Sequence, residues 1–419
     1  MSASLEKGIN VLKEQIDSSV AAFFSSCVHC GMCADACLFY TETGDPSRIP
    51  INKAEPLRRI WKSEYTLMGR IGKLFGLSKK VDEKLLTDWE TLVYDSCTLC
   101  GRCSMVCPVG NDIALMIRKT REGMAAAGHA PDGLIGASKR AVTIGSPMGV
   151  KWPALQAQIK HTEENTGLKI PVDVEGAEYM LLLSSMEIMN FPEFIGAVTK
   201  IFDKAGASWT ISSEAFEATN SGIQIGVSDI AAELVQRIVD AAEKLKVKTV
   251  ISPECGHAYM AIRWEGPNLV GKAFNFKVRH ILEVLDEFRK NGRLKITGKE
   301  TQRLTYHDPC QVSRRGGVIE QPRNLINLFA GNFVEMEDAG KMNWCCGAGG
   351  GVSANERADE IRLKVFQRKK NQLDQIKPDA IISACSNCRI YLEDALEEYG
   401  MDIPLMSLTE TLAEHLSEE

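Results

Sequence analysis

The sequence lacks the features that indicate a membrane-spanning, secreted or nucleic-acid-binding protein. Its apolar runs fall far short of the ~20 residues that a membrane helix requires. Its start, MSASLEKGINVLKEQIDSSVAAFF, lacks the charged-then-apolar order of a signal peptide. The 49 Lys and Arg against 55 Asp and Glu give a net charge of −6, which provides neither a broad basic field for nucleic acid nor a polybasic membrane anchor. We therefore expect a cytoplasmic chain, soluble in itself, without a nucleic-acid partner.

Cysteine, in contrast, is abundant and grouped. Two of its groups repeat the spacing C-x2-C-x2-C-x3-C: Cys27, Cys30, Cys33 and Cys37, then Cys97, Cys100, Cys103 and Cys107. A large intracellular chain with such repeats uses its thiols for metal or redox chemistry more often than for disulfides. This spacing is typical of [4Fe-4S] clusters, whereas zinc, the alternative, is usually held by two separate C-x2-C pairs.

The spacing also favours crossed ligation of two cubane [4Fe-4S] clusters. Three cysteines of one run can wrap one cluster, while the fourth is better placed for the neighbouring cluster. Pro108 follows the second run as in many bacterial ferredoxins, whereas Leu38 follows the first. The expected ligand sets are Cys27, Cys30, Cys33 with Cys107, and Cys97, Cys100, Cys103 with Cys37.

A third group has a different spacing, C-x34-CC-x38-C-x2-C, formed by Cys310, Cys345, Cys346, Cys385 and Cys388. It supplies one more thiolate than a cubane uses, and two adjacent cysteines cannot both join a regular cluster without an unusual bridging arrangement. The glycines after the pair, from Gly347 to Gly351, permit close approach to a bulky group. A phosphate loop is disfavoured because neither G-x-G-x-x-G nor the P-loop lysine is present. The third group therefore predicts an unusual metal site, whose role the spacing leaves open.

The pattern of elements divides the chain into four segments. Residues 1–128 carry helical signals and are expected to form a ferredoxin-like helical double-cluster module, and 129–175 a linker with one helix around 154–163. The rest alternates strands and helices, which implies parallel sheets. Strands are expected at 178–185, 208–212, 248–252, 303–309, 332–337 and 379–384, and helices at 193–205, 230–245, 322–328 and 354–375.

Two strand-ending segments, VKTVISPEC (247–255) and PDAIISAC (378–385), can be superposed. Cys255 then matches Cys385, while Ala258 stands where Cys388 would be. We infer an internal duplication, with a degenerate lobe at 176–295 and a complete one at 296–419. Cysteines at strand ends suit the rule that sites in such sheets form at the carboxyl ends of strands.

Other candidate residues have two interpretations each. Cys255 is either a sixth thiol of the site or a remnant of the duplicated one. His257 and His307 could deliver protons to a leaving thiolate, but a hydrogen-bonded structural role is the favoured interpretation. Arg314 and Arg315 could attract an acidic partner or a thiolate, although a solvated charged turn is the default.

Three motifs carry a resemblance to a known family. HDPC (307–310), WCCGAGGG (344–351) and SACSNCRIY (383–391) resemble the cysteine-rich CCG domain in the B- and D-type subunits of heterodisulfide reductase, also found in glycolate oxidase iron–sulfur subunits. With the double-cluster module, the layout is similar to the D-type subunit. SPECGHAY (252–259) and the degenerate first copy resemble DsrK, HmeD and TmcB, cytoplasmic catalytic subunits of membrane redox complexes.

The resemblance implies a noncubane [4Fe-4S] cluster that cleaves or forms a disulfide in one-electron steps, held by Cys310, Cys345, Cys346, Cys385 and Cys388. It further implies a heterodisulfide reductase-like enzyme of sulfur metabolism, with a membrane haem b subunit, other redox subunits and a DsrC-like disulfide or trisulfide protein as partners. Such a chain is expected at the inner face of the cell membrane through these subunits. The alternatives are a non-catalytic electron-relay subunit of a hydroxyacid oxidase-type complex and a zinc scaffold.

Overall fold

The computed structural model describes residues 2–417, which form two compact units built from discontinuous segments. The first unit comprises Met1–Gly136, Ser221–Ser228 and Gly347–Arg368. The second comprises Ala137–Asn220, Asp229–Cys346 and Lys369–Glu419. The sequence predicted continuous segments with boundaries at residues 128, 175 and 295. It did not predict that the first unit also includes the two short segments Ser221–Ser228 and Gly347–Arg368.

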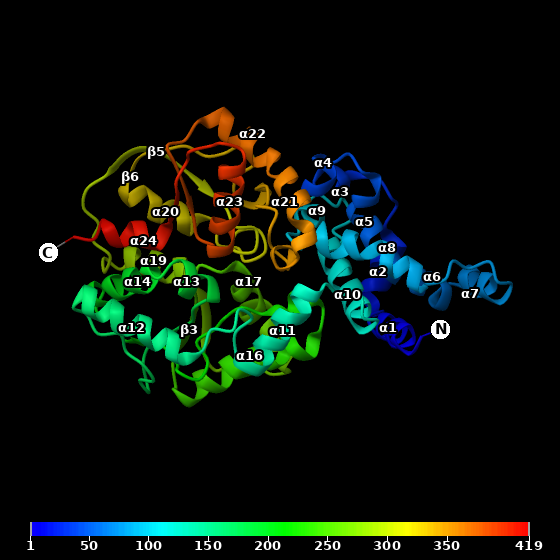
Figure 1. Ribbon diagram of the computed structural model, residues 1–419, viewed down its shortest axis with the longest axis horizontal. Coiled ribbons are helices and arrows are strands. Elements are labelled where there is room, and N and C mark those ends of the chain that lie inside the picture. The colour runs from blue at the N-terminus through cyan, green and yellow to red at the C-terminus, as the bar shows by residue number, and fades with distance from the viewer. Residues whose placement is uncertain (1, 418–419) are drawn as a thin grey trace. The chain divides into compact units, whose positions relative to one another are not determined.

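The first unit is helical, as its sequence predicts, and its described residues contain no strand (Figure 1). Among residues 2–417, no helix has both the length and the apolar character needed to cross a membrane. The helices of this unit are α1 (Ala3–Glu14), α2 (Ser18–Ser26), α3 (Met32–Asp35), α4 (Leu38–Thr41), η1 (Pro46–Arg48), α5 (Pro50–Lys53), α6 (Glu55–Tyr65), α7 (Leu67–Leu74), α8 (Glu83–Glu90), η2 (Thr91–Asp95), α9 (Arg102–Met105), α10 (Ile113–Ala126), α15 (Ser221–Ile225), η5 (Val352–Ala354), η6 (Glu356–Ala358) and α21 (Asp359–Val365).

Helices α1 and α10 cross at two glycines. A Cβ on Gly8 would lie 2.5 Å from the Cβ of Ala127, and a Cβ on Gly123 would lie 2.2 Å from the Cγ of Leu12. Only glycine therefore permits this approach of the two helices. Leu12 is fully buried at the crossing, which links the N-terminal helix to the helix that follows the second cysteine run.

A buried arginine joins the separate segments of the first unit. Arg121 of α10 is fully buried, and its guanidinium donates five hydrogen bonds to four backbone carbonyls. The acceptors are the oxygens of Val93 (3.1 and 2.8 Å), Cys97 (2.7 Å), Gln224 (2.6 Å) and Gly350 (2.5 Å). Its charge also lies over the ring of Tyr94, 4.8 Å from the centroid. These bonds compensate the cost of burying the cation.

The second unit contains two four-stranded sheets in which all strand pairs are parallel (Figure 1). Their strand orders, β2-β1-β3-β4 and β6-β5-β7-β8, follow the same connection pattern. The strands are β1 (Tyr179–Leu181), β2 (Trp209–Thr210), β3 (Thr249–Ser252), β4 (Lys277–His280), β5 (Glu300–His307), β6 (Ala330–Phe333), β7 (Ala380–Ser383) and β8 (Leu405–Ser407).

The helices of the second unit surround these strands (Figure 1). They are α12 (Trp152–Thr166), α13 (Ser185–Asn190), α14 (Glu193–Lys204), α16 (Ser228–Lys244), α17 (Gly256–Tyr259), η3 (Met260–Glu265), α18 (Gly266–Val270), α19 (Ile281–Lys290), α20 (Glu320–Phe329), η4 (Gly340–Met342), α23 (Ser386–Glu398) and α24 (Leu408–Glu414). Two further helices, α11 (Asp132–Ile144) and α22 (Gln367–Ile376), contain unit boundaries, as does α16 between its first and second residues.

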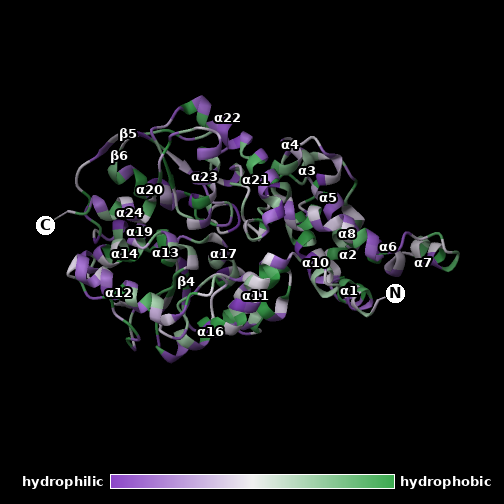
Figure 2. Cartoon of the chain, in the orientation of Figure 1, coloured by the Kyte–Doolittle hydropathy of each residue, from purple (hydrophilic) through white to green (hydrophobic). Residues whose placement is uncertain are grey.

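Three details differ from the sequence prediction. The expected linker 129–175 holds two helices, α11 and α12, rather than one. The single helix expected at 354–375 is interrupted into η6, α21 and α22, of which α22 is largely hydrophilic (Figure 2). The strands β4 and β8 were missed because they are short edge strands without an apolar run.

The two sheets share one hydrophobic core. Leu181 and Ile251 of the first sheet belong to the same buried cluster as Leu304, Tyr306 and Ile382 of the second. Parallel strands with helices on both faces are apolar along their whole length, which explains why the central strands were visible in the sequence. The carboxyl ends of β3, β5 and β7 are thereby held by one packed body.

We predict that Arg121→Met destabilises the first unit. The substitution leaves four buried carbonyls without their donor, so the expected loss is about 3 kcal/mol or more. Anaerobic thermal unfolding of the cluster-containing protein, followed by circular dichroism, measures it. Arg118→Met, on the same helix but only half-buried, is the control, and an equal loss in both variants would contradict the role of Arg121.

Candidate metal centres

The first two cysteine runs fold in the same way. His29 and Leu99, each preceding the second cysteine of its run, have positive φ values of 54° and 55°. Gly31 and Gly101, which follow that cysteine, have φ values of 85° and 76° and cap the short helices α3 and α9. Such left-handed backbone in non-glycine residues is uncommon and concentrates at functional sites. The repeated sequence spacing is therefore matched by a repeated local structure.

Cys37 lies with the cysteines of the second run. One cavity is lined by all four of Cys37, Cys97, Cys100 and Cys103. Burial raises the pKa of Cys103 well above its usual value, and negative charge on Cys100, Cys37 and Cys97 adds to this effect. The buried Lys53 approaches this set, with its Nζ 3.9 Å from the Cys37 Sγ, and also donates to the carbonyl of Ser96. Four thiols around one cavity are the donor set that a [4Fe-4S] cluster takes.

Three of the remaining cysteines, Cys27, Cys30 and Cys33, interact with one another. Burial, and then the charges of Cys27 and Cys30, raise the pKa of Cys33. Ser26, directly before Cys27, and Asn111, four residues after Cys107, exchange hydrogen bonds of 3.2 and 3.1 Å. This contact brings the end of the second run to the beginning of the first.

The third cysteine group gathers beyond the carboxyl ends of β5 and β7. Cys310 follows β5, Cys385 caps α23 after β7, and Cys388 lies in the first turn of α23. The Sγ atoms of Cys310 and Cys345 are 3.8 Å apart, and those of Cys346 and Cys388 are 3.3 Å apart. All five of these cysteines are buried, and all fourteen in the chain are free thiols.

Charged residues hold the loop that carries the cysteine pair. Asp308 is buried and receives two hydrogen bonds from Arg323, of 2.6 and 2.7 Å, and one from the backbone of Gly340. Arg314 donates to the carbonyls of Lys341 and Asn343 at 2.9 Å each. The default expectation of a solvated charged turn was therefore wrong for Arg314, because this residue is buried and anchors the loop.

His307 belongs to the site itself. It is fully buried, and among residues 2–417 neither ring nitrogen has a hydrogen-bond partner. One ring nitrogen and the Sγ atoms of Cys346 and Cys388 lie within 4.8 Å of one another. The favoured interpretation of His307 as a hydrogen-bonded structural histidine was thus wrong. Burial lowers its pKa well below the usual value, so the imidazole is neutral.

Cys255 lies beside Cys385, although the two come from different sheets. The residue before it, Glu254, accepts a hydrogen bond of 2.9 Å through its carbonyl from the backbone of Ser386. Burial and the charge of Cys385 raise the pKa of Cys255 well above its usual value. Hydrogen bonds from the Cys388 side chain and from backbone N–H groups, including that of Gly256, lower the pKa of Cys385. The site can therefore hold a thiol and a thiolate side by side.

Three buried carboxyl groups near Cys255 were not found from the sequence. Burial raises the pKa of Glu187, Glu217 and Glu254, the last to about 7. One carboxylate oxygen each of Glu187 and Glu254 has no hydrogen-bond partner among the described residues. The charges of Glu187 and Glu217 act on Cys255. Glu254 lies within the SPECGHAY motif but was not singled out there, and no motif distinguishes Glu187 and Glu217 from ordinary surface glutamates, so only their burial reveals them.

Lys369 was also missed. It is buried, and its Nζ donates to Gln372 at 2.7 Å and lies 3.5 Å from the Met336 sulfur. Burial lowers its pKa to about 8, although the charges of Asp308 and of the nearby cysteines Cys346, Cys345 and Cys388 oppose this. In sequence it is one of several consecutive basic residues, a pattern typical of a solvated helix face.

Family comparisons agree with this division. Residues 24–111 match the 4Fe-4S dicluster domain, and residues 304–393 match the cysteine-rich CCG domain. The two matches define an iron–sulfur protein of the class that joins a dicluster domain to a CCG domain.

Curated relatives are similar to the chain over most of its length. The chain is 28% identical over 414 residues to the D subunit of dihydromethanophenazine:CoB--CoM heterodisulfide reductase from Methanosarcina acetivorans, covering 93% of both chains. It is 26% identical over 405 residues to Hdr-like menaquinol oxidoreductase iron-sulfur subunit 2 of Archaeoglobus fulgidus, covering 85% of this chain and 72% of the relative. It is 26% identical to the EtfAB:quinone oxidoreductase of Syntrophomonas wolfei, covering 89% of this chain and 55% of the relative. Over most of its length the chain is thus similar to iron–sulfur subunits of heterodisulfide reductase-like complexes, and it contains both a dicluster and a CCG domain match.

The grouping of Cys37 with the second run predicts how double variants behave. Cys37→Ala should cost one cluster, and adding Cys97→Ala should cost no further cluster because both residues serve the same one. Adding Cys27→Ala instead should remove both. Spin quantitation of the reduced protein by EPR, together with iron analysis, measures the loss.

The two double variants control for each other, since each removes two thiols. Retention of one cluster when Cys37 and Cys27 are both replaced would show that each run serves its own cluster, contrary to the grouping around the cavity.

Proposed function

We propose that this chain is the catalytic iron–sulfur subunit of a heterodisulfide reductase-like redox complex. In this proposal the first two cysteine runs would hold two cubane [4Fe-4S] clusters for single-electron transfer, and the third group would hold a noncubane [4Fe-4S] cluster at which a disulfide is reduced or formed. The observation that carries the proposal is the buried set of five thiols and one unpartnered histidine at the carboxyl ends of β5 and β7. A relay cluster needs four ligands only, so the excess donors support a catalytic site.

The proposed ligands combine the sequence spacing with the groupings of thiols, which support the set around Cys37. Cys37 with the second run, and Cys107 with the first three cysteines, supply the two cubanes. The noncubane site takes Cys310, Cys345, Cys346, Cys385 and Cys388. The clusters supply one-electron transfer, and the chain supplies their enclosure, the reacting thiols and the protons.

Proton supply matches the stoichiometry of the reaction. Reduction of a disulfide to two thiols consumes two electrons and two protons. Burial raises the pKa of Glu187 and Glu217, which favours their protonated forms. In their ionised forms both groups raise the pKa of Cys255, so they lie near its thiol. Ser185 donates to Glu217 and shares a 2.8 Å hydrogen bond with Ser146. We propose that these acids deliver protons at the Cys255 side of the site.

Cys255 is proposed to take part in the exchange and not to be a remnant. Its thiol lies beside Cys385, a proposed cluster ligand whose lowered pKa favours the thiolate form that a ligand needs, so Cys255 is next to the place where a disulfide would react. The matching strand orders of the two sheets support the proposed duplication, in which Cys255 after β3 corresponds to Cys385 after β7. The degenerate lobe would thus have kept one reactive thiol.

The partners are proposed on the same basis. Two of the relatives are named as subunits of quinol or methanophenazine oxidoreductases, which supports other redox subunits as partners. We propose a membrane haem b subunit as electron partner, a DsrC-like dithiol protein of dissimilatory sulfur metabolism as disulfide or trisulfide substrate, and a position at the inner face of the cell membrane. A second candidate function is an electron relay without disulfide chemistry. The similarity to an EtfAB:quinone oxidoreductase is the observation in its favour.

EPR of the oxidised protein, with and without a dithiol partner, tests the proposal. We expect a spin-one-half signal to appear on oxidation and to disappear in Cys345→Ser. Cys255→Ser, which removes a neighbouring thiol outside the proposed ligand set, should keep the signal and slow disulfide turnover. If only the cubane signals of the reduced protein are detected, the catalytic proposal is contradicted and the electron-relay function remains.

A second prediction concerns the acids. Glu187→Gln keeps the hydrogen bonds that its carboxylate accepts from Ser184, of 2.7 and 3.0 Å, but cannot give up a proton. Disulfide reduction should slow by about 10-fold or more, with the oxidised EPR signal unchanged. Glu193→Gln, an exposed position on α14, is the control. An unchanged rate in Glu187→Gln would remove this residue from proton delivery.

A further inference from the structure

The segment from α6 to the turn after α7 exposes an apolar tip. Leu67, Met68, Leu74, Phe75 and Leu77 are each between 70% and 82% exposed. The figures show hydrophobic residues concentrated on α7 and the following turn, at the end of the first unit that projects beyond its other helices (Figures 1 and 2). Large apolar side chains this exposed, and this close together, mark a contact surface and not a folding core.

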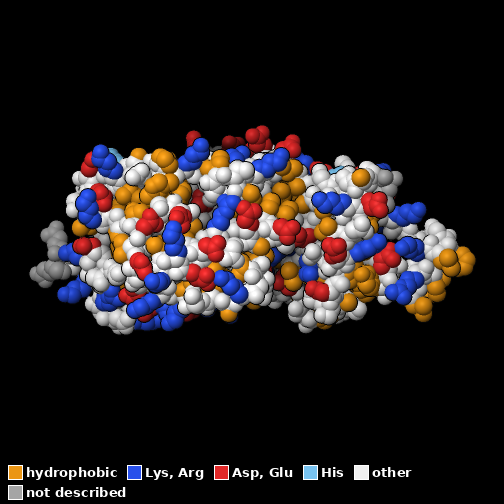
Figure 3. All heavy atoms as spheres, turned by 90° about the horizontal axis from the view of Figure 1, so that it is seen from below, with side chains coloured by type: hydrophobic (Ala, Val, Ile, Leu, Met, Phe, Trp, Pro, Cys, Tyr) orange, Lys and Arg blue, Asp and Glu red, His pale blue; other side chains and the backbone are white. Residues whose placement is uncertain are grey.

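Basic residues surround the apolar tip. Residues 55–80 contain seven Lys and Arg against two Glu, a local charge of +5 within a chain whose net charge is −6. Figure 3 shows Lys and Arg side chains next to the hydrophobic end of this unit. The net charge of the whole chain gave no sign of a polybasic membrane anchor, because it averages over this local basic cluster.

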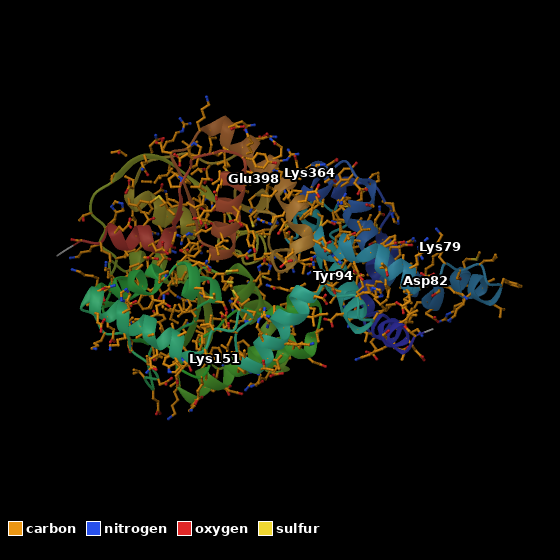
Figure 4. All side chains as sticks on the ribbon, viewed as in Figure 1. Lys79, Asp82, Tyr94, Lys151, Lys364 and Glu398 are labelled. Carbon is orange, nitrogen blue, oxygen red and sulfur yellow. The ribbon has the colours of Figure 1, made fainter. Side chains whose placement is uncertain are left out.

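A cavity of about 380 Å³ lies between α6 and α7, directly beside the tip. Its lining includes Arg58, Arg59, Lys62 and Lys79, together with the apolar Met68 and Leu77. Glu55 pairs with Arg58 and Arg59 at 2.6 and 2.9 Å. The side-chain ammonium groups of Lys62 and Lys79 have no ion-pair partner among the described residues, and Lys79 lies at the α6–α7 end of the unit (Figure 4). The cavity thus joins uncompensated positive charge to an apolar rim.

The combination fits the boundary of an anionic bilayer. Apolar side chains of a surface-bound helix enter the region between headgroups and acyl chains, while adjacent Lys and Arg meet lipid phosphates. The tip residues lie on α7 and on the turn beyond it, so a fluid surface can cover them together. The cavity presents its cations where phosphate groups would then lie.

We propose that the α6–α7 segment docks this chain directly on an anionic membrane surface, with the apolar tip in the bilayer boundary and a lipid phosphate at the basic cavity. This contact goes beyond the proposed redox function. It would give the chain its own membrane affinity in addition to any contact made by partner subunits.

Flotation of the full, cluster-containing chain with vesicles tests the proposal. We expect binding to vesicles of phosphatidylcholine and phosphatidylglycerol, weaker binding to phosphatidylcholine alone, and a decrease as salt is raised. Leu74→Glu with Phe75→Glu should reduce binding by about 10-fold or more. Lys62→Glu with Lys79→Glu should abolish the preference for phosphatidylglycerol.

Met189→Glu with Trp264→Glu is the matched control, because these apolar residues are 54% and 50% exposed in the second unit. This variant should bind vesicles as the unmodified chain does. Failure of the unmodified chain to bind either vesicle would overturn the proposal and leave the tip to a protein partner. Full binding by the Leu74→Glu with Phe75→Glu variant would show that the apolar tip does not contribute to binding, and would overturn the proposal. Complete displacement of the unmodified chain from the vesicles by inorganic phosphate would show anion adsorption only, and would also overturn the proposal. The EPR spectra of the same samples report the clusters separately, so a failed redox proposal would not be mistaken for a failed membrane contact.

Discussion

The hydrogen bonds of Arg121 are the contact on which the first unit most depends. A guanidinium buried without partners would be prohibitively unfavourable, so its five hydrogen bonds and the four carbonyls that accept them must form together. One acceptor, Cys97, belongs to the second cysteine run, and two others, Gln224 and Gly350, come from segments far away in sequence. The same group thus fixes a cysteine of the dicluster domain and assembles a unit from three pieces of chain.

This assembly has a consequence for the third cysteine group. The chain passes from the second unit to the first between Cys346 and Gly347. Gly350, with a positive φ of 64°, approaches Thr98 so closely that a Cβ would lie 2.6 Å from its carbonyl carbon. At least one of the glycines after the cysteine pair, Gly350, is therefore needed for packing against the Cys97 loop. Their sequence interpretation, close approach to a bulky group, identified the backbone requirement but not the neighbour that imposes it.

The sequence predicted what depends on short-range spacing and missed what depends on long-range packing. The cysteine runs and the central strands were recognisable because ligand spacing and continuous apolar runs are local properties. Arg121 and Lys369 could not be recognised, since basic residues in a helical pattern are mostly solvated. Arg314 and His307 were misjudged for the same reason: their roles are set by loops that reach them from elsewhere in the chain. Residues 65–77 were overlooked because a net charge averages over local clusters.

Electrostatics connects the excess thiols to the buried acids. In a buried site, each thiolate makes the addition of another negative charge less favourable. The thiolates therefore favour neutral carboxyl groups and a protonated lysine. Burial raises the pKa of Glu187 and Glu217, and Lys369, with a pKa lowered to about 8, still bears a positive charge below that pH. In the proposed reaction, disulfide reduction creates two sulfur anions among these groups. Burial disfavours negative charge, so it favours the protonated acids and also makes the new sulfur anions strong proton acceptors. Each electron that reaches the site therefore promotes the transfer of a proton to it.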